Sequence, residues 1–208
     1  MTERLEHFRE WVEAHQMLTG AIVVAVFLCV YLLSVRLRQP ADAWLNVAFI
    51  NEYRNVGSGS EIYEDFMSLE VPQGQRVVFD TDYFFDLSND RDFANQYYQK
   101  LVAYLESGTT DAVVCTQDNL RGIAQGGRVL DLTDERASGI YSDYSDRLYY
   151  YEDDEAGRLP VGISLSGSPY EDELGYKEEI YLALSSRATH ISQVEKLLNF
   201  LLSEGGKK

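Results

Sequence analysis

The chain contains one long apolar run, which lies near its N-terminus. Met17–Val35 is a stretch of 19 residues without a charged side chain. At about 1.5 Å per residue, a helix of this length reaches roughly 28 Å, close to the hydrocarbon thickness of a bilayer. The run ends in Leu33–Arg36, which lacks the small residues of a signal-peptide cleavage site. The pattern predicts a retained transmembrane helix over residues 17–36 that anchors the chain in a lipid bilayer. A buried core helix is the alternative, but the remaining chain suits one modest domain that could hardly surround it.

Shorter patterns flank this run. Residues 1–16 have apolar side chains, including Phe8 and Trp11, at the three-four spacing of an amphipathic helix. Pro40 lies in a brief polar segment that follows the run. The predicted organisation is a juxtamembrane helix over 1–16, a transmembrane helix over 17–36, a linker over 37–43 and a globular domain over 44–208.

The globular region alternates apolar runs with segments of helical periodicity. Runs rich in β-branched and aromatic residues predict strands, and apolar residues spaced by three and four predict helices. This alternation predicts a three-layer α/β domain. In chain order the expected elements are a strand over 44–51, a helix over 61–69, a strand over 76–80, a helix over 91–107, a strand over 111–115 of the kind buried in a parallel sheet, a helix over 118–124, a returning segment over 129–132, a strand within 158–169 and a strand followed by a helix within 181–204.

Composition and charge narrow the possible functions. The chain is 45% hydrophobic and 12% aromatic, as expected of a folded protein. Its formal net charge is −16, while residues 1–40 carry equal numbers of basic and acidic side chains, so the negative charge belongs to the domain. Such a domain repels phosphate backbones, and we therefore expect no nucleic-acid partner. Cys29 lies in the predicted anchor and Cys115 in a predicted buried strand, so we expect no disulfide within the chain.

A glycine-serine turn provides the first candidate binding site. Ser58 and Ser60 belong to a GSGS turn between the first predicted strand and the first predicted helix. Backbone N–H groups converge at such a helix start and can hold an anion or a polar ligand group. The alternative is a plain helix start, because Ser58 and Glu61 have the spacing of a capping box.

An acidic segment after the second predicted strand gives a competing interpretation. Asp80 and Asp82 imitate the paired aspartates of haloacid-dehalogenase-type phosphotransferases, although Phe84 stands where that pattern needs Thr or Val. A metal-dependent hydrolase or phosphotransferase using Asp80 and Asp82 is therefore the alternative function. The following oxygen-rich run could also bind calcium, but it lacks the glycine and closing glutamate of an EF-hand loop, and a solvated loop with a helix N-cap is favoured. We predict no metal site and no cofactor.

The tyrosine-rich segment gives the second candidate binding site. Tyr149, Tyr150 and Tyr151 belong to the densest aromatic group in the chain, which also includes Tyr141 and Tyr144. Surface tyrosines can stack on sugars or anchor a protein partner, whereas a half-buried strand is the plainer explanation. Ser166, beside Gly167, could offer a hydroxyl to a ligand or mark the end of a strand.

Catalytic chemistry is poorly represented in the domain. His190 is its one histidine and precedes the last predicted helix, whose start is marked by Ser192 and Glu195. Cys115 lies in an apolar strand, where thiols are usually inert. A Ser-His or Cys-His pair would therefore depend on His190 alone. We predict that the protein is not an enzyme.

Several segments resemble one protein family. The stretch DAVVCTQDNLRGIAQGGRVLDLTD over 111–134, the strand RLPVGISLSGSP over 158–169 and the ending YLALSSRATHISQVEKLLNFLLSE over 181–204 resemble type 2 periplasmic solute-binding proteins. The N-terminal order of short helix, anchor, linker and LNVAFI is similar to single-pass membrane proteins of Gram-positive bacteria that carry a shortened domain of this kind.

The resemblance implies a location, a fold and a function. Two arginines on each side of the anchor leave its orientation open, and the resemblance implies a cytoplasmic N-terminus and an extracytoplasmic domain at the cell membrane. It implies the fold of one lobe of such a binding protein. Because only a short segment joins Asp134 to Leu159, the second lobe is expected to be missing or reduced to a hairpin. The expected function is a membrane-anchored, non-enzymatic binding or interaction module that is accessory to a transporter or surface complex, with a protein partner in the membrane or cell envelope.

Overall fold

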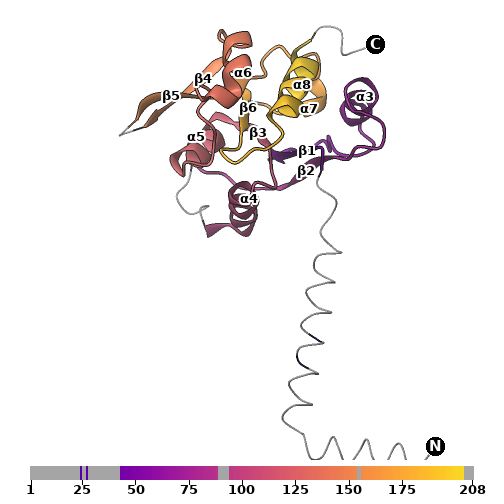
Figure 1. Cartoon of the computed structure of the whole chain (residues 1–208), viewed down its shortest axis with the longest axis horizontal. Helices are drawn as coiled ribbons and strands as arrows, with labels where there is room; N and C mark the ends of the chain where they lie inside the picture. The colour runs from indigo at the N-terminus through magenta and orange to yellow at the C-terminus, as the bar shows by residue number, and fades with distance from the viewer. Residues whose placement is uncertain (1–23, 25–26, 28–42, 89–93, 154–155, 204–208) are drawn as a thin grey trace, which may run out of the picture. The chain divides into compact units, whose positions relative to one another are not determined.

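The computed structural model describes residues 43–88, 94–153 and 156–203, together with Val24 and Phe27 (Figure 1). The predicted juxtamembrane helix and nearly all of the predicted anchor and linker lie outside these residues. Val24 and Phe27 are helical and exposed. Within the described ranges, no helix combines the length and the apolar character needed to cross a bilayer. The chain divides into two compact units, Met1–Asp42 and Ala43–Lys208, and the following description concerns the second.

A six-stranded sheet of strand order β2-β1-β3-β6-β5-β4 forms the centre of this unit. Strand β1 pairs in parallel with β2 and with β3, while β6 is antiparallel to both β3 and β5, and β4 is antiparallel to β5. The expectation that β3 lies in a parallel sheet is therefore correct on one side of the strand only. The strands are β1 Leu45–Ile50, β2 Val77–Tyr83, β3 Ala112–Thr116, β4 Leu148–Asp153, β5 Gly157–Ser164 and β6 Ile180–Leu184.

Helices cover both faces of the sheet (Figure 1). One face packs against α3, α6, α7 and α8, and the other against α4 and α5. This arrangement confirms the predicted α/β class and its three layers. The helices are α3 Glu61–Leu69, α4 Gln96–Glu106, α5 Gln117–Gln125, α6 Ser138–Asp143, α7 Glu171–Leu174 and α8 Ile191–Leu202, with a short 3-10 helix η2 at Glu135–Ala137.

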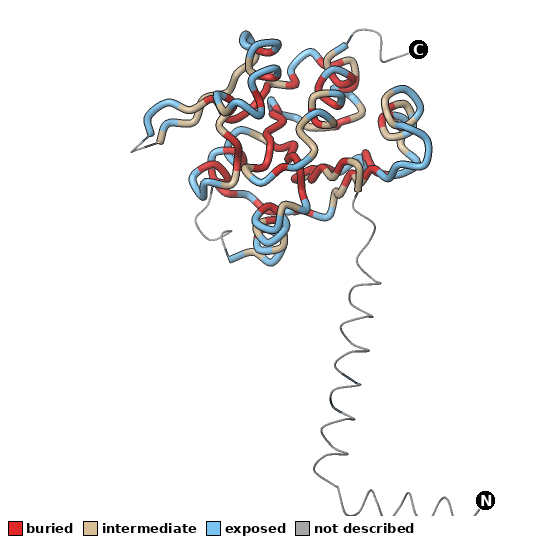
Figure 2. Tube along the Cα trace, in the orientation of Figure 1, coloured by how far each residue is buried: buried red, intermediate tan, exposed pale blue. Residues whose placement is uncertain are grey.

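The central strands are buried on both faces, as the red segments of Figure 2 show. In β1, Leu45, Val47 and Phe49 pack on the side of α3 and α8, whereas Ala48 and Ile50 pack on the side of α4 and α5. Successive strand side chains point to opposite faces, so a strand covered on both faces must be apolar throughout. The near-continuous apolar runs in the sequence have this cause.

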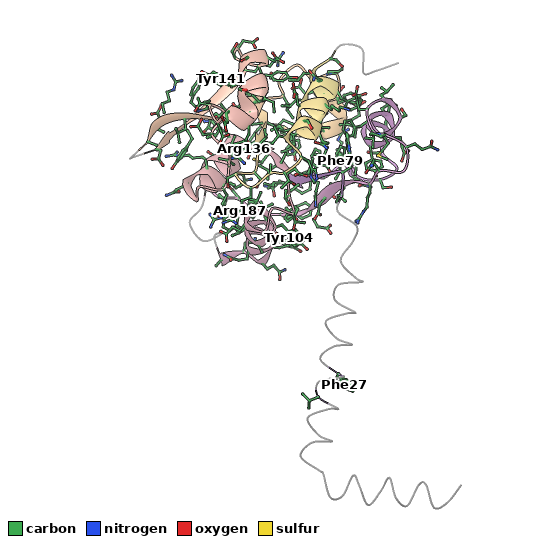
Figure 3. All side chains as sticks on the ribbon, in the orientation of Figure 1. Phe27, Phe79, Tyr104, Arg136, Tyr141 and Arg187 are labelled. Carbon is green, nitrogen blue, oxygen red and sulfur yellow. The ribbon has the colours of Figure 1, made fainter. Side chains whose placement is uncertain are left out.

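An aromatic cluster holds α3 on the sheet. The Phe79 ring lies 5.2 Å from the Phe49 ring, 5.5 Å from Tyr63 and 5.8 Å from Phe66, measured between centroids. Figure 3 marks Phe79 in the sheet beside α3. These tilted, edge-on and stacked aromatic pairs add to the stabilisation that burial provides. The loop between β1 and α3 is thereby held at the carboxyl end of β1.

Several local predictions need correction. The capping residue of α3 is Ser60, whose Oγ accepts a hydrogen bond from the Tyr63 backbone N–H, so Ser58 is not the cap. Strand β2 continues three residues beyond Asp80 because it follows β1 to its end. Helix α4 begins at Gln96 after the capping residue Asn95, while residues 89–93 lie outside the described chain.

Two segments in the second half of the chain need more detail than the sequence provides. The returning segment 129–132 forms a single bridge, Val129 to Ser185. The backbone N–H groups of Leu130 and Leu132 donate to the carbonyls of Leu184 in β6 and Pro160 in β5. Because these acceptors belong to two different strands, the segment cannot form a regular ladder with either. Helix α8 begins at Ile191, and the Ser192 hydroxyl donates to Gln193 rather than capping the helix.

A buried carboxylate joins β1, β3 and α8. Asp111 is 1% exposed, and its Oδ2 accepts the Asn46 backbone N–H at 3.0 Å. Its Oδ1 accepts the His190 backbone N–H at 3.2 Å and lies 3.0 Å from His190 Nδ1. The partner of the domain's one histidine is thus a structural carboxylate, which fixes where α8 begins. Sequence reasoning missed this role of Asp111.

Replacing Asp111 tests this junction. We expect Asp111→Ala to lower the free energy of unfolding of the compact unit 43–208 by roughly 3 kcal/mol, because partly buried N–H donors lose their acceptor. Asp172→Ala, at an exposed position of α7, should change it by no more than about 0.5 kcal/mol. Urea unfolding followed by circular dichroism measures both values. A loss below about 1 kcal/mol for Asp111→Ala would show that the junction is not structurally important.

Candidate functional site

A hollow of about 560 Å³ lies along β4 and the loops at its start. It is lined by Tyr149, Tyr150 and Ser166, three of the residues predicted to bind a ligand. The hairpin of β4 and β5 projects from the body of the domain (Figure 1). The structure therefore brings together parts of the tyrosine-rich segment and the serine that follows β5.

Tyr150 is held by a residue of the neighbouring strand. The Arg158 guanidinium lies 4.0 Å from the centroid of the Tyr150 ring, and its Nε is 3.6 Å from Oε1 of Glu152. A guanidinium over an aromatic face is attracted by the negative charge of the ring face. The exposed ion pair adds little to stability, but together these contacts orient the Tyr150 ring.

Tyr149 contacts the sheet from the same strand. Its ring lies 4.9 Å from the Tyr181 ring, and burial raises the pKa of both hydroxyls. For Tyr181, a hydrogen bond to Glu179 and the charge of that carboxylate raise the pKa further. The Glu179 carboxylate also accepts the Ser164 hydroxyl at 2.7 Å. Both tyrosines are thus neutral at physiological pH and retain a hydroxyl proton.

The other two predicted residues of this region differ in their placement. Tyr151 packs beside Leu159 against the core on the α4 and α5 side and does not line the hollow. Ser166 lines the hollow, and its carbonyl oxygen accepts the Arg147 Nη1 at 2.7 Å. Tyr141 and Tyr144, which the sequence groups with these tyrosines, pack on the core around α6.

Sequence reasoning missed several residues around the hollow. Arg158 could have been found, because pairing of a hairpin over this segment places it opposite Glu152. Glu179 and Tyr181 belong to β6, and no local pattern in the sequence connects them with β4. Their position depends on β6 lying between β3 and β5, which only the fold shows.

Ser58 and Ser60 line a different hollow, of about 440 Å³, beside the loop between β1 and α3. The Ser60 Oγ caps α3 and donates to the Val56 carbonyl at 2.8 Å. The Glu64 carboxylate accepts the Gly59 backbone N–H at 3.3 Å. The Gly59 and Tyr63 N–H groups at this helix start are thus bonded within the chain, and the nearby carboxylates repel an anion.

The same loop is supported from inside by Glu52. This carboxylate is 2% exposed and accepts the backbone N–H groups of Arg54, of Asn55 at 2.8 Å and of Val56 at 3.4 Å. A buried carboxylate with several backbone donors stabilises a loop conformation. Glu52 therefore has a structural role next to the hollow that contains Ser58 and Ser60.

The paired aspartates of the alternative function have local partners. Asp80 Oδ2 lies 3.3 Å from Lys100 Nζ, and Asp80 Oδ1 accepts the Asp82 backbone N–H at 3.1 Å. The same ammonium group lies 4.6 Å from the Tyr83 ring centroid. The cation beside Asp80 is thus a lysine of α4. Among the residues that the structure describes, no group of three His, Cys, Asp or Glu side chains is placed to hold a metal ion.

Strand β4 forms one edge of the sheet, and its backbone orientation follows from its pairing. The Ser164 backbone N–H donates to the Arg147 carbonyl at 2.9 Å, so Arg147 faces β5. Along an antiparallel strand, the backbone groups of successive residues alternately face the neighbouring strand and point away from it. The pairing of β4 with β5 contains an irregularity between Tyr149 and Tyr150, but its extra residue, Val161, lies in β5, so the alternation along β4 continues. Leu148, Tyr150 and Glu152 therefore direct their N–H and C=O groups away from β5.

A proline provides independent support for this orientation. Tyr150 pairs with Pro160, which has no backbone N–H to donate, and the Pro160 carbonyl accepts the Leu132 N–H at 2.8 Å on its other side. Tyr150 and Pro160 thus form no backbone hydrogen bond to each other. Within the described ranges, no backbone hydrogen bond from elsewhere in the chain covers the outward groups of Leu148, Tyr150 and Glu152.

Comparison of the chain with protein-family profiles, with curated proteins and with solved structures returned no match.

Hydrogen exchange tests the orientation of β4. In the unit 43–208 we expect the Tyr150 amide to exchange at least ten times faster than the Tyr151 amide, because only the latter faces β5. Two-dimensional NMR after transfer into deuterium oxide measures both rates. Equal protection of the two amides would show that the outward edge of β4 is covered.

Proposed function

We propose that the protein is a membrane-anchored, non-enzymatic binding module whose domain lies outside the cell and binds its partner at the hollow along β4. The observation that carries this proposal is the hollow of about 560 Å³, in which Tyr149 and Tyr150 lie beside Ser166. Aromatic rings with polar tips are typical of binding surfaces, because they bury a large area and still form hydrogen bonds.

The polar groups of the hollow suit recognition. Asp146, Glu152 and Glu179 supply carboxylates, and Arg147 and Arg158 supply guanidiniums. Mixed charges around aromatic side chains set the orientation and specificity of a bound partner.

The potential nucleophiles of the domain favour binding over covalent catalysis. Burial raises the pKa of the Cys115 thiol, which holds it in its unreactive protonated form. His190 is oriented by Asp111 at the start of α8 and is part of a structural junction. Neither side chain lines the hollow along β4.

The anchor supports a location at the membrane. Its 19 uncharged residues match the length of a bilayer-spanning helix, and the resemblance to solute-binding proteins favours a cytoplasmic N-terminus. The tether would hold the domain at the membrane, where a transporter or surface complex is the expected partner. Restriction to the membrane raises the effective concentration of the domain for such a neighbour.

Selective thiol labelling tests the proposed location. In the full chain with Cys29→Ser, a cysteine introduced by Gln73→Cys should react with a membrane-impermeant maleimide on intact cells, because position 73 is exposed. A matched variant with Glu10→Cys should react only after lysis, while buried Cys115 adds little background. Labelling of the Glu10→Cys variant alone on intact cells would place the domain in the cytoplasm.

Site-specific photo-crosslinking tests the binding role. A benzophenone side chain at position 150 of the full chain should give a discrete adduct in the native membrane. The control position is Tyr104, which lies on α4 and is 39% exposed (Figure 3). We expect the yield at position 150 to exceed that at position 104 at least tenfold. Equal yields, or no adduct at position 150, would contradict a binding role for the hollow.

A further inference from the structure

We propose that β4 accepts an extended, positively charged segment of a partner protein, which adds to the sheet as a further strand. This inference rests on the proposed binding function and names the chemistry of the partner. It is supported by the outward backbone of β4, by the apolar character of its first residues and by the charges around it.

The two edges of the sheet differ in their protection. At the β2 edge, the Tyr63 hydroxyl donates to the Val77 carbonyl at 3.2 Å, and a side-chain hydrogen bond of this kind hinders the pairing of a further strand. Acidic residues do not distinguish the two edges, because Asp80 and Asp82 lie in β2 and Glu152 and Asp153 lie in β4. Strand β4 begins instead with Leu148–Tyr151, a run of one leucine and three tyrosines that are all partly exposed.

The β4 backbone offers a regular set of partners to an added strand. Leu148, Tyr150 and Glu152 each present one outward N–H and one outward C=O, by the pairing described above. Outward-facing residues recur about every 6.8 Å along an extended strand, which matches the spacing of such groups on any peptide in the same conformation. Main-chain hydrogen bonds of this kind supply affinity in strand addition, while side-chain pockets supply specificity.

The hollow provides the pocket. Its lining includes both Leu148 and Tyr150 from β4 and extends to Ser166 and Tyr181. Side chains of an added strand alternate between the two faces of the sheet, so every second one would reach an aromatic surface of β4. The volume of about 560 Å³ has room for more than one such side chain.

The charges favour a cationic occupant. Asp146, Glu152 and Glu179 line the hollow, and Asp153 follows in β4. The Arg158 guanidinium already lies over Tyr150 and beside Glu152. Arg147, the other guanidinium, is bonded to a carbonyl oxygen, and the whole chain carries a formal net charge of −16. Lysine or arginine side chains would find carboxylates and tyrosine faces here.

A second copy of this chain fits less well than a cationic partner. Antiparallel pairing of two β4 strands around Tyr150 would place Glu152 of each copy opposite Leu148 of the other, so this carboxylate would meet no cationic side chain directly across the pair. Each copy also carries the same strongly negative charge, which opposes association. Self-association is therefore a distinguishable outcome of the test.

The test is a selection with the full chain in lipid nanodiscs. The probe is a library of displayed octapeptides, with a matched counter-selection against the variant Tyr150→Pro. Proline removes the outward N–H and blocks the edge without breaking a backbone hydrogen bond to β5. It also removes the Tyr150 ring from beside Arg158, so the variant should fold with a urea midpoint only slightly below that of the parent chain. We expect selected peptides to be rich in Lys or Arg at alternate positions and in β-branched residues between them.

Binding by synthetic copies of the selected peptides decides the mechanism. Affinity should fall at least tenfold for Tyr150→Pro, remain within threefold for Tyr150→Phe and weaken as salt is added. N-methylation of the peptide residues whose N–H groups face β4 should abolish binding. N-methylation of the residues between them, whose N–H groups point away from β4, should not. This second measurement does not depend on the folding of any protein variant.

Each contrary result has a defined meaning. A selection without binders, or one that enriches acidic or uncharged peptides, would overturn the proposal. Concentration-dependent dimerisation of the chain that Tyr150→Pro abolishes would show that β4 pairs with a second copy of the chain and not with a cationic partner. Peptides that bind Tyr150→Pro normally but lose affinity for Tyr149→Ala would overturn strand addition and leave the proposed binding function intact. Failure of the proposed function would instead appear as a lack of crosslinking at position 150.

Discussion

The burial of β1, β3 and β6 from both sides is the constraint on which the rest of the domain depends. These strands place apolar residues on two faces, and separate helix layers cover each face. A shift of one residue in any of them would exchange the two sets of side chains, so their register is strongly specified. Because β6 runs antiparallel between β3 and β5, the hairpin of β5 and β4 continues the sheet outward. The exposed edge at β4 is thus a consequence of how the core is built.

The polar groups that support this core are distinct from those that can bind a partner. Asp111 and Glu52 are buried carboxylates whose oxygens are bonded to the chain itself. Asp80 is paired with Lys100, and this pairing gives no specific support to the metal-dependent alternative. Around β4, by contrast, Tyr149 and Tyr150 lie in a hollow and the outward backbone has no partner from the described chain. This division between bonded core groups and available edge groups supports a binding role.

Much of the fold could be predicted because local signals agreed with the tertiary structure. The helix 61–69 is predictable, since the glycine-serine turn before it and a clear apolar face mark it, although the capping serine is Ser60 and not Ser58. The strand at 111–115 was recognisable because burial on both faces demands a continuous apolar run. The segment 129–132 returns the chain to the sheet, as expected, but its bonding to two different strands rather than to one ladder depends on strand order and has no local signal. The mixed sheet was missed because strand direction depends on distant pairing that no local pattern encodes.

The candidate site was predictable only where one segment contains it. Tyr149 and Tyr150 stand out by their density, whereas Glu179 and Tyr181 reach the hollow through the order of strands. The most direct measurement of the central claim is hydrogen exchange at the Tyr150 amide of the full chain, with and without a selected cationic peptide. Strand addition predicts fast exchange in the free chain and at least tenfold slower exchange when the peptide is bound. An exchange rate that the bound peptide leaves unchanged would contradict it.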